Sequence, residues 1–363
     1  MIAQHGTVEI SRSRLAHNLQ LVRGHVPGTA ICATIKANAY GHGAIPVARA
    51  LPAADAFALA SVEEAVQLRE AGIATPLVLL EGVFAADELE AVAAHDLQLV
   101  IHSPEQVEWL EQDNSAAPLH LWLKVDTGMH RLGVAPAQLN ELRRRLASLI
   151  AARGGSLRLM SHLACADVPK HPANDRQLAA FRTLDAGGLE RSLANSAALL
   201  SRQDMRFDWV RPGIMLYGAS PFESATEWQT TLRPVMSLES QLIAVYARRK
   251  GDSIGYGQTW SCPRDMPVGV VAAGYGDGYP RHAPAGTPVL VNGQVAPLAG
   301  RVSMDMTCVD LSDQPNARPG DPVRLWGDGL PVESVAANAG TISYEVLCNV
   351  SPRVPREYSD GKS

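Results

Sequence analysis

The chain has 363 residues, of which 46% are hydrophobic and 19% charged, and its formal net charge is −5. This length predicts two domains, and a negative charge without a basic stripe argues against nucleic acid or an anionic membrane as partner. No segment is long and apolar enough to span a bilayer, and the first ten residues have no apolar export signal. The five cysteines are scattered without a Cys-x-x-Cys pair, so we expect no disulfide framework, no metal site and a cytoplasmic location.

Short apolar runs alternate with helical patterns over the first two thirds of the chain. Amphipathic patterns predict helices at 61–71, 87–94 and 136–153, the first of them with a serine cap and a glutamate three residues later. The apolar runs predict eight strands, at 31–35, 56–60, 76–80, 97–102, 119–125, 157–163, 191–195 and 209–216. Eight strands alternating with helices favour a parallel (β/α)₈ barrel over the alternative, an open doubly wound sheet.

The pattern changes after residue 232. Strands are expected at 237–247, 268–273, 288–295, 307–311 and 322–326 without long intervening helices, and one helix is expected at 331–339. Asn292-Gly293 is a hairpin signal, because both residues tolerate the positive φ of a type I′ turn. We therefore predict an α/β chain with an amino-terminal barrel, residues 9–231, and a mostly-β carboxy-terminal domain, residues 232–363.

Polar residues follow several of the predicted barrel strands, where the functional residues of such barrels gather. Each has an ordinary structural explanation when taken alone, such as a paired lysine or a helix cap, but their convergence does not. They are Lys36, Arg131, His162, Asn195, Ser196, Arg211 and Gly213. Asn195-Ser196 opens a helix and Gly213-Ile214 exposes backbone N–H groups, a pattern typical of phosphate sites. A lysine facing a phosphate anchor indicates pyridoxal 5′-phosphate held as a Schiff base.

These residues lie in motifs by which the chain resembles bacterial alanine racemases over essentially its whole length. The motifs are A-T-I-K-A-N-A-Y-G-H-G at 33–43, K-V-D-T-G-M-H-R-L-G at 124–133, S-H-L-A at 161–164, N-S at 195–196, R-P-G-I-M-L-Y-G at 211–218, G-Y-G at 255–257, G-Y-G-D-G-Y-P-R at 274–281, G-R-V-S-M-D-M at 300–306 and T-I-S-Y-E-V at 341–346. The resemblance implies a barrel that binds pyridoxal 5′-phosphate and a β domain that includes residues 1–8. It also implies interconversion of L- and D-alanine for peptidoglycan metabolism, by supplying or degrading D-alanine.

The resemblance also assigns cofactor contacts. Lys36 corresponds to the Schiff-base lysine, and Arg211 to the partner of the pyridine nitrogen. Arg131 corresponds to the group that binds the cofactor's phenolic oxygen and the substrate carboxylate. The phosphate contacts correspond to Tyr40, Ser196, Gly213, Ile214 and Tyr344.

Racemisation needs proton transfer on both faces of Cα, which two opposed bases provide. By resemblance these are Lys36 for D-alanine and Tyr256 for L-alanine, with a chain Tyr256–His162–Arg211 stabilising the phenolate. The resemblance implies a head-to-tail homodimer, because Tyr256 and Met304, which contacts the substrate carboxylate, reach the partner's site.

Two further expectations concern the rim of the site. Lys124 corresponds to a lysine that is N-carboxylated in the family; the alternative is an unmodified lysine paired with a carboxylate such as Asp126. The entrance is expected to involve Tyr275, Tyr279, Arg281 and Asp305.

Other functions remain as alternatives: a broad-spectrum amino-acid racemase, a decarboxylase built on the same kind of barrel, and a non-catalytic protein that binds pyridoxal 5′-phosphate. Arg211 argues against the decarboxylase, which favours an acidic partner for the pyridine. The β domain argues against the non-catalytic protein, and the missing export signal against the broad-spectrum racemase.

Overall fold

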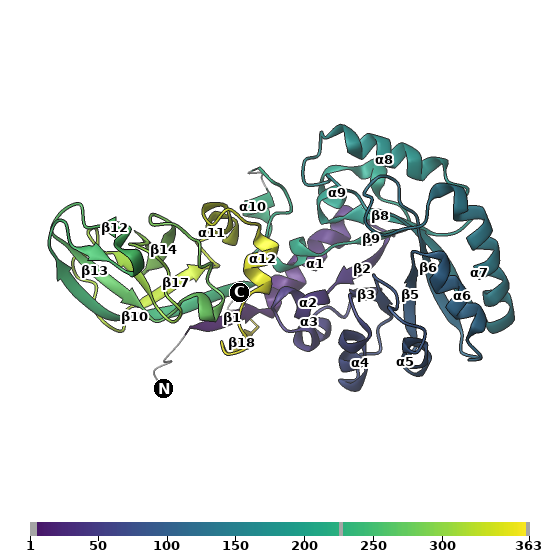
Figure 1. The fold of residues 1–363 in the computed structure, drawn as a ribbon, viewed down its shortest axis with the longest axis horizontal. Coiled ribbons are helices and arrows are strands. Elements are labelled where there is room, and N and C mark those ends of the chain that lie inside the picture. The colour runs from purple at the N-terminus through teal and green to yellow at the C-terminus, as the bar shows by residue number, and fades with distance from the viewer. Residues whose placement is uncertain (1–5, 225–227, 361–363) are drawn as a thin grey trace.

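The computed structural model describes residues 6–224 and 228–360, and it separates into a barrel and an elongated β domain joined end to end (Figure 1). Residues 1–5, 225–227 and 361–363 lie outside the described residues. The first of these ranges is half of the ten-residue segment in which no export signal was found, and the other two belong to the predicted domains. Among the helices that the structure does describe, none has both the length and the apolar character needed to cross a membrane.

Within the described part of the chain, eight parallel strands close into a barrel. Each strand pairs with the next, and the last pairs with the first through Ala30↔Trp209 and Ile31↔Val210. The predicted barrel is therefore confirmed, and the open sheet is wrong. The strands are β2 (Ala30–Thr34), β3 (Ala56–Leu59), β4 (Leu77–Leu79), β5 (Leu97–Ile101), β6 (Leu119–Lys124), β7 (Gly155–Met160), β8 (Arg191–Asn195) and β9 (Trp209–Arg211).

Helices cover the outside of the barrel. Ser61 and Ser103 cap two of them, each accepting a hydrogen bond from the backbone N–H three residues later. The predicted helix at 136–153 is a 3₁₀ turn, η1 (Pro136–Gln138), followed by a helix. The helices are α1 (Arg12–His25), α3 (Ala44–Ala50), α4 (Val62–Glu70), α5 (Glu88–Ala94), α6 (Pro104–Gln112), α7 (Leu139–Arg153), α8 (Pro172–Thr183) and α9 (Ser196–Ser201).

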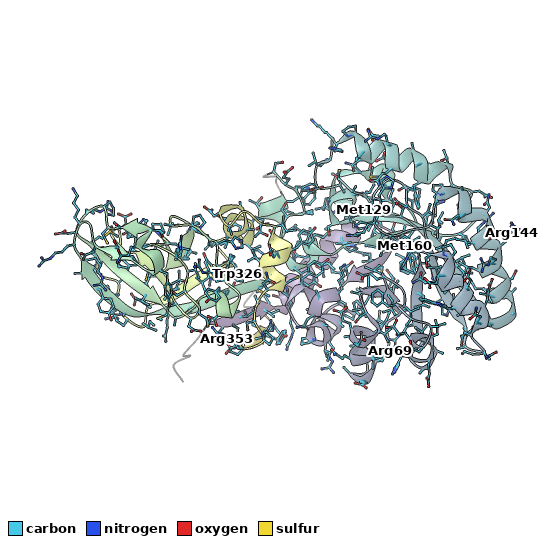
Figure 2. All side chains as sticks on the ribbon, viewed as in Figure 1. Arg69, Met129, Arg144, Met160, Trp326 and Arg353 are labelled. Carbon is cyan, nitrogen blue, oxygen red and sulfur yellow. The ribbon has the colours of Figure 1, made fainter. Side chains whose placement is uncertain are left out.

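The interior of the barrel is packed, so only its mouth can hold a ligand. Cys32, Val100 and Met160 belong to a buried cluster inside it, and Figure 2 shows Met160 at this position. Below them the Arg158 guanidinium lies 5.1 Å from the ring centroid of Trp122 and 5.0 Å from that of Trp209. Such cation–π contacts tie facing strands together and leave the carboxyl ends of the strands as the open side.

Two predicted strands end earlier than expected. β7 stops at Met160, so Ser161 and His162 belong to the loop that follows it. β9 stops at Arg211 because Pro212 has no N–H to donate, and a 3₁₀ turn, η3 (Ile214–Tyr217), follows. The first change places Ser161 and His162 in the loop at the mouth of the barrel, and the second does the same for the backbone of Gly213.

The carboxy-terminal domain is built on a mixed sheet that is eight-stranded over the described residues. Its first strand pairs with β10 from Thr7↔Glu239 to Ile10↔Met236, which agrees with the predicted place of the amino terminus. The Asn292-Gly293 turn joins two strands as predicted, with positive φ at both residues. The strands are β1 (Thr7–Ser11), β10 (Met236–Arg248), β13 (Met266–Val271), β14 (Pro288–Val291), β15 (Gln294–Pro297), β16 (Thr307–Asp310), β17 (Pro322–Trp326) and β18 (Arg356–Ser359).

Shorter elements complete the domain and connect it to the barrel. Helices α11 (Val332–Asn338) and α12 (Ser343–Cys348) lie at the junction, where α12 contacts the short turn α2 (Lys36–Tyr40) of the barrel (Figure 1). A small hairpin of β11 (Ser253–Ile254) and β12 (Trp260–Ser261) lies at the end of the domain remote from the barrel. The remaining short elements are α10 (Trp228–Thr231), η2 (Gln203–Met205), η4 (Tyr256–Gln258) and η5 (Tyr275–Asp277).

Candidate active site

A cavity of about 500 Å³ lies at the mouth of the barrel, a volume typical of small-ligand sites. It is lined by the residues that the sequence places at the ends of different strands, together with Tyr40 of α2 and Tyr344 of α12. The predicted site residues among them are Lys36, Tyr40, Lys124, Arg131, His162, Asn195, Ser196, Arg211, Gly213, Ile214 and Tyr344. The structure thus brings eleven of the predicted residues together within one chain.

Lys36 is followed by a left-handed turn. Residues 37–40 all have φ between 51° and 54°, a conformation that costs L-residues roughly 1–2 kcal/mol each. Glu64 compensates by accepting hydrogen bonds from the N–H groups of Ala37, at 2.6 Å, and Asn38, at 3.4 Å. The sequence predicts this glutamate as part of a helix cap. One carboxylate oxygen does accept from Ala60 N at 2.9 Å, next to the start of α4, while the other fixes the backbone after the lysine. The sequence gives no signal for the left-handed turn.

The loop beyond this turn is held by the carboxy-terminal end of the chain. Tyr358 Oη donates to His42 O at 2.9 Å, and Arg356 Nε donates to Gly41 O at 2.8 Å. Gly41 has a φ of 81°, and a Cβ there would lie 2.2 Å from Leu347 O in α12. The close approach therefore requires glycine and locks the lysine segment against the β domain.

An anion cradle lies between the ends of β8 and β9. Asn195 Oδ1 caps α9 by accepting from Ala198 N at 3.1 Å, which leaves the Ser196 hydroxyl to accept from Gly213 N at 2.8 Å. A Cβ at Gly213 would fall 2.7 Å from Tyr40 Oη. Burial raises the pKa of Tyr40, so its hydroxyl stays protonated and can donate. Hydroxyls and backbone N–H groups converging on one spot suit a phosphate.

Arg211 and His162 form a buried pair at the floor of the cavity. Arg211 Nη2 donates to Ser161 O at 2.6 Å and lies 3.3 Å from His162 Nδ1, while Nη1 donates to Ser192 Oγ. Burial lowers the pKa of Arg211 to about 10, which leaves it charged at neutral pH. Burial and the nearby Arg211 hold the pKa of His162 well below its ordinary value. A neutral imidazole that accepts at Nδ1 carries its proton on Nε2.

Lys124 and Arg131 are brought to the same wall by a loop that folds back on β6. Val134 N donates to Lys124 O and Asp126 N donates to Val134 O, both at 2.9 Å. Burial, followed by Arg211 and Arg131, lowers the pKa of Lys124 to about 8. Asp126, the alternative partner of Lys124, instead accepts three backbone N–H groups of residues 128–130 and forms an ion pair with His130 at 3.3 Å.

Glu81 is the cavity residue that the sequence analysis missed. Its Oε1 lies 3.9 Å from Lys36 Nζ, and among the described residues it is the one carboxylate that lines the cavity. The signal was weak, because Glu81 follows a short apolar run and matches none of the motifs. A glutamate directly after a barrel strand is nevertheless at the functional end of that strand.

Tyr256 and Met304 are not brought to the cavity within one chain. Tyr256 begins η4, beside β12 at the remote end of the β domain, and its side chain is 67% exposed. Met304 is 53% exposed, and Met304 O accepts from Gly276 N at 2.8 Å, so its segment is tied to that of Tyr275. Exposed aromatic and thioether side chains on a rigid rim are typical of interaction surfaces.

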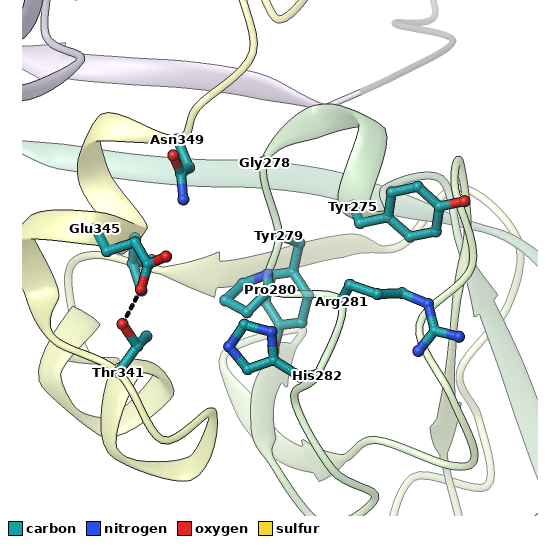
Figure 3. A pocket seen from close by; sticks show the side chains of 10 residues that line it. Tyr275, Gly278, Tyr279, Pro280, Arg281, His282, Thr341, Glu345 and Asn349 are labelled. Carbon is teal, nitrogen blue, oxygen red and sulfur yellow. Dashed lines mark hydrogen bonds between the residues drawn. The ribbon is translucent and has the colours of Figure 1, made fainter.

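The predicted entrance residues fall on this same rim. The Arg281 guanidinium lies 5.9 Å from the ring centroid of Tyr275, whereas Tyr279 is buried (Figure 3). The Tyr279 ring stacks on Trp326 at 6.1 Å between ring centroids. Asp305 accepts from Arg353 Nη2 at 2.8 Å. Tyr279 and Asp305 therefore support the rim, while Tyr275 and Arg281 face outward.

The fold and cavity together define a small-molecule-binding (β/α)₈ barrel with an appended β domain, in which cations surround an anion cradle. The family description "Alanine racemase, N-terminal domain" matches residues 10–221, and "Alanine racemase, C-terminal domain" matches residues 235–358. The chain therefore belongs to the alanine racemase family.

Individual relatives support this assignment. The alanine racemase of Nitrosococcus oceani is 53% identical over 347 residues, covering 96% of this chain and 97% of that protein. The crystal structure of biosynthetic alanine racemase from Pseudomonas aeruginosa matches with a TM-score of 0.92 and 48% identity, covering 99% of this chain and 100% of that one. The alanine racemase structure from Bartonella henselae, described as having covalently bound pyridoxal phosphate, matches with a TM-score of 0.88 and 31% identity, covering 98% and 99% of the two chains.

Proposed function

We propose that this protein is a racemase that interconverts L- and D-alanine with pyridoxal 5′-phosphate as its cofactor. The observation that carries the proposal is the juxtaposition of Lys36 with the anion cradle at Ser196 and Gly213, in one cavity of a chain about half identical to alanine racemases. We propose the barrel as residues 9–231 and the β domain as residues 232–363 together with 1–8. The pairing of β1 with β18 continues to Ser11, three residues beyond this boundary.

The residues of the cavity fit the cofactor. Lys36, Lys124, Arg131 and Arg211 give it an excess of positive charge, which a phosphate and a substrate carboxylate would neutralise. The absence of a side chain at Gly213 leaves the space next to Tyr40 Oη that a phosphate oxygen needs. Lys36 would hold the cofactor covalently, Arg131 its phenolic oxygen and Arg211 its ring nitrogen. The phosphate would be held by Tyr40, Asn195, Ser196, Gly213, Ile214 and Tyr344.

When bound, pyridoxal 5′-phosphate makes the Cα proton of an amino acid acidic by withdrawing electron density from Cα. Lys36 removes or returns this proton on one face, with D-alanine as its substrate. Tyr256 does the same on the other face, with L-alanine as its substrate. Arg131 and Met304 hold the substrate carboxylate.

Arg211 and His162 prepare Tyr256 for this task. An unperturbed phenol has a pKa of about 10, so it needs hydrogen bonding and positive charge to act as a base near neutral pH. Neutral His162, which accepts from Arg211 at Nδ1, has its Nε2–H free to donate to the phenolate oxygen. A guanidinium carries only donors, so Arg211 leaves the ring nitrogen unprotonated and disfavours decarboxylation.

Lys124 is proposed to be N-carboxylated. With a pKa lowered to about 8, a substantial share of the amine is neutral and can attack carbon dioxide. The product is an anion placed among Arg131, Arg211 and Lys36, where it offsets their repulsion. In ¹³C-bicarbonate the protein should show a carbamate carbon resonance that Lys124→Arg lacks; a wild-type spectrum without it would refute the modification.

The functional unit is proposed to be a head-to-tail homodimer. Tyr256 lies at the end of the β domain remote from the barrel, Met304 is also exposed, and Ile342, which precedes α12, is 62% exposed. Two copies related by a twofold axis would bring each rim to the other's cavity. Measurement of molar mass by light scattering tests this, because a fully active monomer would contradict it.

We also propose that the protein works in the cytoplasm. The five cysteines are all free thiols in the structure, which suits a reducing compartment. Recovery of the protein in the periplasmic or membrane fraction of its source cells would contradict this.

Incubation of the purified protein with L-alanine and pyridoxal 5′-phosphate, followed by chiral chromatography, tests the function directly. We expect equal amounts of the two enantiomers at equilibrium, from either starting material. Release of carbon dioxide would favour the decarboxylase instead. Faster turnover of a larger amino acid than of alanine would favour a broad-spectrum racemase.

A further inference from the structure

We propose that Glu81 is the counter-ion of Lys36: a positioning residue whose carboxylate stabilises the proton that Lys36 Nζ carries between transfers. The inference deepens the proposed function and rests on it for the role of Lys36. It assigns a purpose to the loop after β4, which carries none of the predicted site residues.

The first support is the composition of the cavity. Glu81 Oε1 lies 3.9 Å from Lys36 Nζ, and each of the two side chains is 37% exposed, so the pair is partly shielded from water. The other charged groups that line the cavity are the cations Arg131 and Arg211 and, before it is carboxylated, Lys124. Since like charges disfavour a second cation nearby, an ammonium at Lys36 needs a compensating anion.

Among the unmodified groups that line the cavity, none besides Glu81 supplies that anion. The remaining titratable groups there are His162, Cys348, Tyr40 and Tyr344. The pKa of His162 is lowered by burial and by the cations, and burial raises the pKa of Cys348 and of both tyrosines, so all four are neutral near pH 7. Glu64 binds the backbone after the lysine, and a carboxylated Lys124 would add a second negative charge, but the carboxylate in ion-pair contact with Lys36 Nζ is that of Glu81.

The second support is that the loop holding Glu81 is fixed by specific contacts. His102 Nε2 lies 3.0 Å from Glu81 O, and Gln106 Nε2 donates to Val83 O at 3.1 Å. Gly82 has a φ of 68°, and a Cβ there would lie 2.4 Å from Val100 O. A tightly packed loop with a required glycine presents its carboxylate at a defined place, unlike a solvated surface glutamate.

This arrangement has a consequence for proton transfer. A proton taken from Cα of D-alanine comes to rest on Lys36 Nζ, and the return transfer sends it back to Cα; Glu81 stays ionised and forms no bond of its own. By favouring the protonated amine, Glu81 sets the pH range in which Lys36 alternates between base and acid. Loss of the carboxylate should move that range to lower pH.

The experiment compares Glu81→Gln and Glu81→Ser with Glu90→Gln, which removes an equal charge from the exposed face of α5. Lys36 in the cofactor-free full chain is labelled with trinitrobenzenesulfonate at a series of pH values and quantified by mass spectrometry. Only the neutral amine reacts, so the labelling midpoint reports its charge. In the holoenzyme, the pH midpoint of the cofactor's visible absorbance change reports the proton on the same nitrogen.

We expect both Glu81 variants to lower the two midpoints by about half a pH unit, the scale of a partly exposed ion pair. The difference from wild type should shrink in 1 M salt, because screening weakens exposed charges. Unchanged midpoints in folded Glu81 variants, or an equal shift in Glu90→Gln, would overturn the proposal. If the wild-type protein bound no cofactor or did not racemise alanine, the proposed function would be wrong. The labelling experiment would still decide whether Glu81 is the counter-ion of Lys36.

Discussion

The mouth of the barrel and the rim of the β domain contribute to chemistry in opposite ways. At the mouth, Arg211 is buried and donates to four protein acceptors, and Ser196 is fixed by Gly213 N. On the rim, Tyr256 and Met304 carry more than half of their surface in solvent. The side chains at the mouth make their hydrogen bonds within one chain. The side chains on the rim are exposed and would make contacts only in the proposed dimer.

This difference indicates how the two halves should respond to mutation. Changes at the mouth should alter cofactor binding or stability in an isolated chain, because the affected contacts are already made there. Changes on the rim should leave the fold and the cofactor untouched and affect only turnover. The four predictions below test this division, from the largest expected effect to the smallest.

Replacing Lys36 by Ala should lower alanine racemisation by about 10³-fold or more, because it removes both the covalent anchor and one base. The cofactor's visible absorbance band should disappear with it. Lys250→Ala, a change at an exposed lysine, is the matched control and should behave as wild type. A Lys36→Ala protein that keeps the band would disprove the role of this lysine.

Tyr256→Phe should lower turnover by about 10²–10⁴-fold while leaving the absorbance band intact, because only proton transfer on one face is lost. In deuterium oxide, exchange at Cα should be lost from L-alanine much more than from D-alanine; equal loss would count against opposed bases. Mixing Tyr256→Phe with Lys36→Ala should restore about a quarter of the wild-type activity, because half of randomly paired dimers carry one intact site. No recovery after subunit exchange would contradict shared sites.

Acid should weaken the fold through His42, whose pKa burial lowers from 6.5 to about 4. Between these pH values the unfolded chain binds a proton at His42 and the folded chain does not, so stability is present above pH 6.5 and is lost as pH falls. The shift corresponds to about 3 kcal/mol of unfolding free energy across this window. The free energy of unfolding, measured with urea from pH 7.5 to 4.5, should depend less steeply on pH in His42→Asn than in wild type. In the control His282→Asn, a change at an exposed histidine, the pH dependence should equal that of wild type. The same slope in His42→Asn as in wild type would rule this out.

Gly213→Ala should weaken cofactor binding about tenfold, equivalent to about 1.4 kcal/mol, because the new Cβ pushes against Tyr40 Oη. The new Cβ meets the end of the Tyr40 side chain, which can shift, so the cofactor-free protein should still fold and melt cooperatively. Gly24→Ala, with nothing within 4 Å of its added Cβ, is the control. Unchanged cofactor affinity in Gly213→Ala would place the phosphate elsewhere.

Much of the fold could be predicted from the sequence, because parallel strands buried on both faces form unbroken apolar runs. The strand 191–195 was predicted to the residue, and the Asn292-Gly293 hairpin follows from turn chemistry. The sequence analysis gave no bounds for helices such as α1 and α8, in which charged and polar residues separate the apolar ones. The strand at 209–216 was overextended because the residues after Pro212 remain apolar while the chain turns.

For the site, motifs predicted the lining of the cavity but not the contacts that support it. The left-handed turn at 37–40 is held by Glu64, a residue from a different element whose carboxylate binds both this turn and the start of its own helix. Glu81 was not predicted because its proposed role as a counter-ion depends on the cations around it, and these come together only in the closed barrel. Local patterns predict elements; the charge balance of a cavity depends on elements distant in the sequence.

The hydrogen bonds from Tyr358 and Arg356 to the loop after Lys36 have a consequence for biosynthesis of the protein. A ribosome makes Lys36 long before residues 356–358, so the segment after Lys36 gains these two contacts only late in translation. The hydrogen bonds seen at the cofactor site are therefore complete only after most of the chain has been made.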